Sequence, residues 1–333
     1  MKINYIFRSK EYNAFSIENV FKYVSNEVKK KECIEFSYLP IARYSIKMFI
    51  KNWMYSFKLK GDILHITGDV HYISLFMPRK KTILTVHDIR AIEFLENKKL
   101  KLYIYITLWV VLPSIKCKYI TTISEKSKEE FCKIAPWAKR KVLVIPNPID
   151  SNLVHNDKKF NSDRPRLLMI GTKENKNHKR MLEAIKDINC IVDIVGVLPE
   201  EEEMFLIDNK ICFENSYRIS DEEIIKKYID SDIVMFASTY EGFGMPIVEA
   251  QSVGRCVITS NIEPMSSVAG NGAILVDPYS VESIRNAVIT IIENKKTREN
   301  IISEGLRNAE KYTQENVGRQ YLELYNEIYM KNK

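Results

Sequence analysis

Short, continuous apolar runs alternate with helix-like segments along this chain, and this alternation restricts its fold more than any other feature. Runs that are apolar throughout and rich in branched and aromatic side chains are typical of strands buried on both faces of a sheet. Such strands separated by helices indicate parallel sheets covered by helices. We interpret as strands the runs KINYIF, IEFSYL, DILHIT, KTILTVHDI, KYITTIS, VLVIPN, RLLMIGT, IVDIVG, DIVMFAS, CVITS and AILVDP.

A polar segment divides this pattern into two halves. Residues 146–166, PNPIDSNLVHNDKKFNSDRPR, contain prolines and turn-forming residues without a helical period, as is typical of a linker. A length of 333 residues also favours two domains. We therefore expect an α/β protein with two doubly wound, Rossmann-like domains facing a cleft. The expected boundaries are 1–150 for the first domain, 151–165 for the linker, 166–313 for the second domain and 314–333 for a C-terminal amphipathic helix, a candidate to pack back on the first domain.

The turn YEGFGMPIVEA, residues 240–250, is the most informative for chemistry, and it follows the run DIVMFAS. Pro246 suits the first position of a helix, and Gly254 suits its end. Glu241 would lie at the carboxyl end of a strand and Glu249 in the first helical turn, so both carboxylates can approach one crevice. Glycines let backbone N–H groups approach a ligand, and a helix start favours phosphate. The turn predicts a nucleotide-sugar site, although acidic residues near a helix start can also do no more than cap it.

A second turn, GTKENKNHKRMLEAI, begins at Gly171 after another predicted strand. Lys176 lies in this loop, where its ammonium group can meet an anion at the edge of the sheet. A lysine in such a loop is more often only solvated. Because Gly171 and Glu241 both follow strands of one predicted sheet, we expect the two turns to line a single crevice.

These turns resemble the motifs of the retaining nucleotide-sugar glycosyltransferases of the GT-B fold, family GT4 or glycosyltransferase group 1. The resemblance depends on two glutamates with seven residues between them in EGFGMPIVEA, followed by VGRCVITS, and it continues in VAGNGAILVDP and GTKENKN. It extends more loosely to TVHD, TTISEKSKEE and VIPNPID, and so covers nearly the whole chain. It implies an acceptor-side first domain and a second domain that binds the nucleotide-sugar.

The resemblance also implies roles for matching residues. Glu241 is expected to face the donor sugar near its anomeric carbon, Glu249 to hold the ribose hydroxyls, and Lys176 to neutralise the diphosphate. The implied catalytic residues are Glu241, His87 and Lys176, and the implied substrate-binding residues are Gly171, Thr172, Lys176, Asn177, Gly242, Phe243, Gly244, Met245 and Glu249.

His87 follows the run TILTV and matches a family histidine that points toward the donor sugar. Its alternative role is that of a hydrogen-bonded histidine at a strand end, with Asp88 placed to orient the ring. Thr172 stands where relatives often have an arginine, which leaves Lys173 or Lys179 to supply that charge.

The loop after the first predicted strand also departs from the family pattern. Many relatives have a glycine-rich loop here, whereas FRSKEYNAFSIENVF contains no glycine. We consider Arg8, Lys10 and Asn13 as replacement donors toward the substrates, with a merely solvated loop as the alternative.

The charge of the chain is unevenly divided. Residues 1–150 contain 27 lysines and arginines against 14 aspartates and glutamates, and residues 151–333 contain 23 against 29. A basic first half suits a phosphorylated substrate, an anionic membrane surface or nucleic acid. We expect no nucleic-acid partner because no such motif is recognisable. The apolar window LYIYITLWVVLP, residues 102–113, is shorter than a membrane span and reads as a buried segment, with shallow insertion at a membrane surface as the alternative.

Cysteine and histidine positions favour neither a metal site nor a disulfide framework. The six cysteines form no CxxC pair, and the five histidines have no ligand spacing. We expect no metal and no cofactor besides the donor substrate.

No signal peptide is recognisable, so we expect a cytoplasmic protein. Peripheral attachment to the inner face of the membrane is a further hypothesis.

The expected function is transfer of a hexose from a nucleoside diphosphate sugar to a saccharide or lipid-linked saccharide. We expect retention of configuration, no metal requirement and a role in surface polysaccharide or glycan synthesis. A sugar-nucleotide epimerase, a phosphorylase on the same architecture and a catalytically silent nucleotide- or saccharide-binding protein are the alternatives.

Overall fold

The structure, a computed structural model, describes residues 1–12, 16–42 and 45–333. It forms two compact units, of which the first contains Met1–Pro148 and Gln314–Lys333, and the second contains Ile149–Thr313. Each unit is built on a six-stranded sheet. All neighbouring strands in both sheets are parallel, as the apolar runs predict.

The sheet of the first unit has the strand order β2-β1-β3-β4-β5-β6. The chain adds strands on one side of β1 and then, from β3 onward, on the other side. The gap between the ends of β1 and β3 is therefore the topological switch point, where open sheets bind ligands. The strands are β1 (Lys2–Phe7), β2 (Cys33–Tyr38), β3 (Ile63–Ile66), β4 (Thr82–Val86), β5 (Tyr119–Thr122) and β6 (Val142–Val144).

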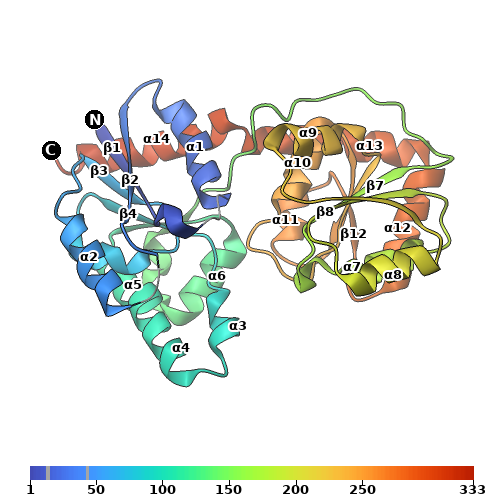
Figure 1. Cartoon of the computed structure of the whole chain (residues 1–333). Coiled ribbons are helices and arrows are strands. Elements are labelled where there is room, and N and C mark those ends of the chain that lie inside the picture. The colour runs from blue at the N-terminus through green and yellow to red at the C-terminus, as the bar shows by residue number, and fades with distance from the viewer. Residues whose placement is uncertain (13–15, 43–44) are drawn as a thin grey trace. The chain divides into compact units, whose positions relative to one another are not determined.

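Helices cover both faces of this sheet (Figure 1). One core cluster joins the sheet to α1 (Ser16–Val28) and to the C-terminal helix α14 (Gln314–Met330), through side chains such as Phe21 and Tyr325. A second cluster, on the other face, includes Met48, Trp109 and Phe131. Its members and neighbours lie on α2 (Ile46–Ser56), η2 (His71–Phe76), α3 (Ala91–Leu95), α4 (Lys99–Tyr105), the π-helical segment η3 (Ile106–Val111) and α6 (Glu125–Ile134). The short helix α5 (Leu112–Lys116) follows η3.

The apolar window 102–113 lies in α4, η3 and α5. Tyr105, Trp109 and Val110 are buried. The prediction that this window is a buried segment is therefore confirmed for the side that faces the core. Among the residues that the structure describes, no helix combines the length and the apolar character needed to cross a membrane.

The sheet of the second unit has the order β12-β11-β10-β7-β8-β9. Its strands are β7 (Arg166–Ile170), β8 (Ile191–Val195), β9 (Cys212–Ser216), β10 (Ile233–Phe236), β11 (Cys256–Ser260) and β12 (Ile274–Val276). Of these strands, only β9 has no counterpart among the predicted strands. This edge strand has the sequence CFENS and is largely exposed, so it lacks the apolar signal of the central strands. The switch point of this sheet lies between β7 and β10.

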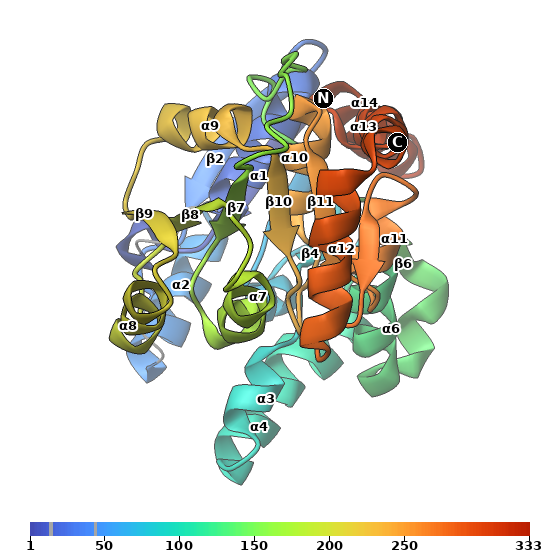
Figure 2. The ribbon, with the colours of Figure 1, turned by 90° about the vertical axis from the view of Figure 1, so that its right-hand side faces the viewer.

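Two groups of helices enclose this second sheet (Figures 1 and 2). On one face lie α9 (Asp221–Asp230), α10 (Met245–Val253) and α13 (Lys295–Ala309). On the other lie α7 (His178–Ile185), α8 (Glu200–Asp208) and α12 (Val281–Glu293). The short helix α11 (Met265–Ala269) follows β11.

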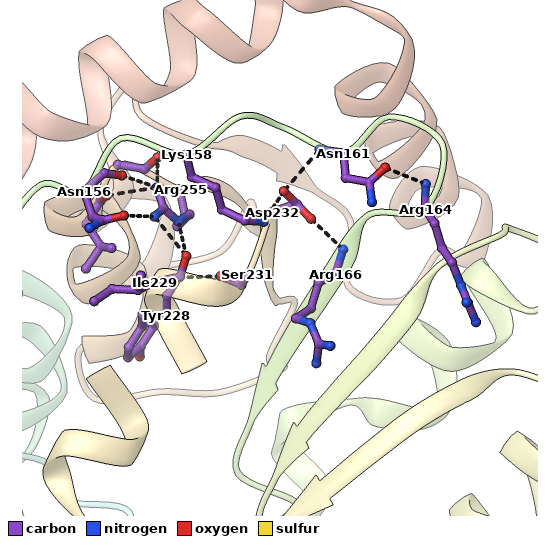
Figure 3. A network of polar contacts seen from close by, with 12 residues as sticks. Asn156, Lys158, Asn161, Arg164, Arg166, Tyr228, Ile229, Ser231, Asp232 and Arg255 are labelled. Carbon is purple, nitrogen blue, oxygen red and sulfur yellow. Dashed lines mark hydrogen bonds and ion pairs between the residues drawn. The ribbon is translucent and has the colours of Figure 1, made fainter. Parts of the chain in front are cut away.

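Most of the expected linker is tied to the second unit (Figure 3). The buried guanidinium of Arg255 donates to the carbonyl oxygens of Asn156 at 2.9 Å and of Ile229 at 3.0 Å. The nearby carboxylate of Asp232 accepts from the backbone N–H of Arg166 at 2.8 Å and pairs with Lys158. These contacts hold residues 156–166, the segment that leads into β7, beside the amino ends of β7 and β10.

Candidate functional site

The candidate site is built on two adjacent strands of the second sheet. Strands β7 and β10 pair in parallel, with Leu167 opposite Ile233 and Leu168 opposite Val234. The turn that begins at Gly171 follows β7, and the turn 240–250 follows β10. Both turns therefore leave the sheet at its topological switch point, as expected from the sequence.

Lys176 and Glu241 form the central contact between these turns. The Nζ atom of Lys176 lies 2.7 Å from Oε1 of Glu241, and the side chains are only 17% and 16% exposed. The side-chain amide of Asn175 donates to the same Oε1 atom at 3.2 Å and to the carbonyl oxygen of Tyr240 at 2.9 Å. Glu241 thus accepts from two donors on the neighbouring loop, which fixes its carboxylate at the strand ends.

Gly171 makes room for the lysine. It has a φ of +81°, and a Cβ atom at this position would lie 2.9 Å from Cε of Lys176. The ammonium group also lies 4.5 Å from the centre of the Phe236 ring at the end of β10, within the range of a cation–π contact. A residue with a side chain at position 171 would displace Lys176 from the switch point.

Glu249 projects from α10 and contacts α9. Its Oε2 atom accepts a hydrogen bond of 2.5 Å from the hydroxyl of the buried Tyr228. Burial raises the pKa of Glu249, whereas the Tyr228 hydrogen bond and the charge of Lys176 lower it. Lys176 therefore acts electrostatically on both glutamates of the motif.

The helix start differs slightly from the sequence prediction. Helix α10 begins at Met245, with Gly244 as its N-cap at a φ of +108°, and Pro246 follows in the first turn. Glu249 is therefore the fifth helical residue and lies in the second turn, so its predicted place in the first turn is wrong. The glycine cap is the physical reason, because it lets the helix begin one residue before the proline. Gly254, with a φ of +79°, ends the helix as predicted.

The turn itself is held by its own aromatic residue. Phe243 is buried, and its ring lies 5.6 Å from that of Tyr312 in an edge-on arrangement. This contact fixes the segment from Gly242 to Gly244 before the helix begins. Within the first turn of α10, Pro246 has no N–H, and the N–H of Ile247 donates to the carbonyl oxygen of Gly244 at 3.0 Å. The backbone N–H groups of Phe243, Gly244 and Met245, at the start of the helix, are therefore the candidates for contact with an anion.

Two other predicted substrate-binding residues make contacts within the protein. The side-chain amide of Asn177 donates to the carbonyl oxygens of Ala237 at 2.9 Å and Pro278 at 2.6 Å. Both of its N–H groups are thereby used to hold the loop. The side chain of Thr172 lies beside Gly196, at the end of β8. Contact of either residue with substrate stays a prediction.

The lysines considered as substitutes for the missing arginine are both exposed. Lys179 pairs with Glu201 of α8 at 2.8 Å. Lys173 stands at the start of the turn Glu174–Lys176.

His87 belongs to the first unit, where it follows β4. Its Nε2 atom lies 2.7 Å from the carbonyl oxygen of Thr67. Because a carbonyl only accepts, Nε2 carries the proton. Burial lowers the pKa of His87, which favours a neutral ring with a lone pair on Nδ1. The carbonyl of Thr67 thus holds the ring, while Asp88 accepts from the backbone of Arg90.

Two charged side chains near the end of β1 have partners within the protein, and their contact with a substrate stays a prediction. Arg8 donates to both carboxylate oxygens of Glu18, at 2.9 and 3.0 Å. The ammonium group of Lys10 lies over the ring of Tyr38, 4.5 Å from its centre. Asn13 lies outside the described residues.

Sequence reasoning missed three residues of interest: Asn175, Tyr228 and Asp69. Asp69 follows β3 at the switch point of the first unit, and burial together with the charge of Asp88 raises its pKa to about 6. The pair Gly68–Asp69 directly after the run DILHIT was the available signal. Asn175 and Tyr228 had no such signal, because their partners lie far away in the sequence.

Comparisons with known proteins agree with this geometry. Residues 150–307 match the family described as Glycosyl transferases group 1. The O-antigen chain mannosyltransferase B of Escherichia coli is 31% identical over 107 residues, which cover 32% of this chain and 28% of that protein. The O-antigen chain mannosyltransferase RfbU of Salmonella typhimurium is 26% identical over 226 residues, covering 64% of this chain and 61% of that protein. Each of these two matches thus spans less than two thirds of the relative.

A longer match links the chain to the UDP-Gal:alpha-D-GlcNAc-diphosphoundecaprenol alpha-1,3-galactosyltransferase of Escherichia coli. It is 26% identical over 283 residues, covering 75% of this chain and 71% of that protein.

Solved structures resemble the whole chain. HepE from Anabaena, in complex with UDP and glucose, superimposes with a TM-score of 0.76 at 15% identity over 98% of this chain and 100% of that one. WaaG, a glycosyltransferase involved in lipopolysaccharide biosynthesis, gives a TM-score of 0.72 at 11% identity over 98% and 99% of the two chains. The expected fold class is confirmed: the chain has the GT-B fold, and its residues 150–307 are similar to the family of glycosyl transferases group 1.

Proposed function

We propose that this chain is a glycosyltransferase that moves a hexose from a nucleoside diphosphate sugar to a hydroxyl group of a saccharide or lipid-linked saccharide. The observation that carries the proposal is the contact of Lys176 with Glu241 at the switch point of β7 and β10, beside the start of α10. This arrangement offers positive charge for a diphosphate and a carboxylate for sugar hydroxyls within one crevice.

Two of the similar proteins support the kinds of substrate. The structure of HepE contains UDP and glucose. The galactosyltransferase of Escherichia coli is named for a UDP-sugar donor and a diphosphoundecaprenol acceptor. We propose substrates of the same chemical kind here, and a role in polysaccharide or O-antigen-like glycan synthesis.

We propose that the reaction retains the configuration of the sugar. The bond between the anomeric carbon and the diphosphate oxygen breaks, and a bond to the acceptor oxygen forms on the same face. The acceptor proton passes to the departing diphosphate. Negative charge that grows on the diphosphate would be stabilised by Lys176 and the N–H groups at the start of α10. In this scheme these groups supply the positive charge, so we propose no metal ion.

Each unit offers acceptor groups for substrate hydroxyls. Glu241, held by Lys176 and Asn175, would accept from sugar hydroxyls near the anomeric carbon. Glu249 would accept from the ribose hydroxyls. His87, with Nε2 committed to Thr67, would offer Nδ1 as an acceptor to a sugar hydroxyl.

Turnover with a panel of nucleoside diphosphate sugars, scored by released nucleoside diphosphate and by the glycosylated product, tests the proposal. The variant Lys176→Met keeps a side chain of similar length without its charge, and we expect a loss of about a hundredfold or more in kcat. The matched control is Lys186→Met, which removes an exposed lysine that pairs with Glu183 on α7.

Two results would contradict the proposal. Nucleotide binding without turnover for any donor would favour a silent binding protein. Equal rates for Lys176→Met and Lys186→Met would remove Lys176 from the chemistry.

A further inference from the structure

Helix α2 has an apolar outward face that is exposed among the residues that the structure describes. Its inward side chains Met48, Asn52 and Ser56 are buried. The α2 face consists of exposed large side chains on the helix and just after it, joined by one residue of η2: Ile46, Ile50, Trp53, Met54, Phe57 and Phe76. Three of them are exposed to a degree that is unusual for their type, with Ile46 at 80%, Phe57 at 68% and Met54 at 61%.

The orientation of the helix is fixed, so the apolar face cannot turn inward. The side-chain amide of Asn52 donates to the carbonyl oxygen of Ile41 at 3.1 Å and to the hydroxyl of Tyr72 at 2.6 Å. Ser45 caps the helix by accepting from the backbone N–H of Met48 at 3.1 Å. A rotation of α2 would break this buried polar contact and the cap together.

The aromatic residues of the α2 face form one cluster. The ring of Trp53 lies 5.7 Å from that of Phe57 and 6.0 Å from that of Phe76. The cluster thus joins α2 to η2 in one continuous apolar surface. Tryptophan and phenylalanine on one side of a basic amphipathic helix are typical of helices that lie in the plane of a membrane surface.

Lysines interleave with the apolar side chains. Lys47, Lys51 and Lys58 are exposed on the same stretch, and residues 39–61 contain five basic residues and no acidic one. Such a surface complements an anionic partner. Two copies of this face would repel each other, which disfavours a symmetric dimer through it. The combination of exposed aromatic and lysine side chains instead fits the boundary between anionic headgroups and acyl chains.

We propose that the α2 face docks the first unit on a membrane surface that contains anionic phospholipid. The inference rests on the proposed function in one respect: docking would serve to bring the enzyme to a lipid-linked acceptor. Docking itself requires no turnover.

This placement differs from the window 102–113 that the sequence suggested as a shallow anchor. Tyr105 and Trp109 of that window face the core. Exposed apolar side chains do remain nearby on α4, at Leu100, Tyr103 and Ile104. They include one aromatic residue, whereas the α2 face combines three, so we assign the docking to α2 and use α4 as the comparison.

Vesicle sedimentation of the whole chain tests the inference. The probes are vesicles of phosphatidylcholine alone and vesicles that also contain phosphatidylglycerol. We expect binding only to the anionic vesicles and a decline with added salt, because surface charges are screened. The double variant Trp53→Ser with Phe57→Ser should reduce the partition coefficient by about tenfold or more, since it removes two large apolar side chains.

Matched variants locate the surface. Leu100→Ser with Tyr103→Ser on α4 should leave vesicle binding unchanged. Lys47→Glu with Lys51→Glu should abolish the preference for anionic lipid, whereas Lys295→Glu with Lys296→Glu, on α13 of the second unit, should not.

Three outcomes would overturn the inference. One is wild-type protein that stays in the supernatant with anionic vesicles at low salt. Another is a loss of binding in the α4 variant but not in the α2 variant. The third is a wild-type dimer, measured by sedimentation velocity without lipid, that the α2 variant converts to monomer, because the face would then bind a second copy. Turnover on a water-soluble acceptor is measured separately, so failure of docking and failure of the proposed reaction are distinguishable.

Discussion

The hydroxyl group of Tyr228 controls the carboxylate that we assign to the ribose. It donates to Glu249 at 2.5 Å, and this hydrogen bond lowers a pKa that burial raises. Loss of the hydroxyl would raise the pKa of Glu249 further and free its side chain to turn. Because a neutral carboxyl group is a weaker acceptor than a carboxylate, binding of the nucleotide would weaken when Glu249 takes up a proton.

We predict that Tyr228→Phe weakens the binding of nucleoside diphosphate by about tenfold at neutral pH. The sign of the pH effect follows from the raised pKa: affinity should fall as the pH falls, and the midpoint of that fall should lie at higher pH in the variant. Calorimetric titration over a pH series measures both effects. Tyr329→Phe on α14 is the control, and a Tyr228→Phe profile that coincides with the wild-type profile would exclude this positioning role.

The residues of the candidate site differ in how well the sequence indicated them. Gly171, Lys176 and Glu241 lie in the turns that follow apolar runs, so their meeting at one sheet edge was predictable from strand order. Tyr228 occupies the inward side of an amphipathic helix, and in the sequence it cannot be distinguished from a tyrosine that only packs in the core. Only the three-dimensional packing of α9 on α10 brings its hydroxyl to Glu249.

Arg255 joins several elements of the second unit. The residue lies between α10 and β11 and is 4% exposed. Its guanidinium donates to the carbonyl oxygens of Asn156 and Ile229 (Figure 3). It also donates to those of Val253 and Gly254. These contacts connect the end of α10 and the end of α9 to the chain that enters the unit. A buried carbonyl that loses its donor costs about 1–3 kcal/mol.

We predict that Arg255→Lys lowers the free energy of unfolding of the second unit by about 3 kcal/mol, because one ammonium group cannot reach carbonyls on both sides. Urea unfolding followed by far-ultraviolet circular dichroism measures the loss. Limited proteolysis should also cut residues 156–166 faster in the variant. Arg319→Lys on the exposed side of α14 is the control; equal stability of the two variants would show that the network contributes little.

Element boundaries were predictable where burial is strong and less so elsewhere. The central strands were found because they are apolar at nearly every position. Strand β9 was not predicted because an edge strand exposes polar side chains. Helix α10 begins one residue earlier than predicted, because Gly244 caps it and the sequence pattern had assigned that glycine to the turn. The attachment of residues 156–166 depends on Arg255 and Asp232, which are about a hundred residues and 70 residues away along the chain.

The first unit brings the two ends of the chain together through a buried polar network. His65 of β3 lies 2.7 Å from the hydroxyl of Tyr325 on α14 and 2.7 Å from that of Thr85 on β4. The hydroxyl of Tyr325 also donates to that of Tyr5 on β1, at 3.3 Å. The C-terminal helix is therefore bonded to the centre of the sheet formed by the N-terminal part of the chain.

Three histidines, His65, His71 and His87, make the first unit sensitive to acid, because burial lowers the pKa of each. Burial lowers the pKa of His65 from 6.5 to about 3 and that of His71 from 6.5 to about 4. Between these values and 6.5 the unfolded chain binds protons that the folded unit excludes, so the free energy of unfolding rises with pH. The stabilisation is complete above about pH 6.5 and is lost as the pH falls, by up to about 1.4 kcal/mol per pH unit for each histidine.

All three tryptophans, at positions 53, 109 and 137, belong to the first unit, so their fluorescence reports its unfolding separately from the second unit. We predict that wild-type stability measured in this way falls between pH 6.5 and pH 4.5. The raised pKa of Asp69, about 6, opposes part of this fall, because the folded unit binds that proton more tightly than the unfolded chain does. The variant His65→Gln, which keeps a donor and an acceptor but does not titrate in this range, should be less stable at neutral pH and should have a slope shallower by up to about 1.4 kcal/mol per pH unit. The two stability curves should therefore converge as the pH falls.

His155→Gln, at an exposed histidine of the second unit, should leave the slope unchanged. Parallel curves for His65→Gln and wild type would mean that His65 is protonated equally in the folded and unfolded chain, and the acid sensitivity of the first unit would then have another origin.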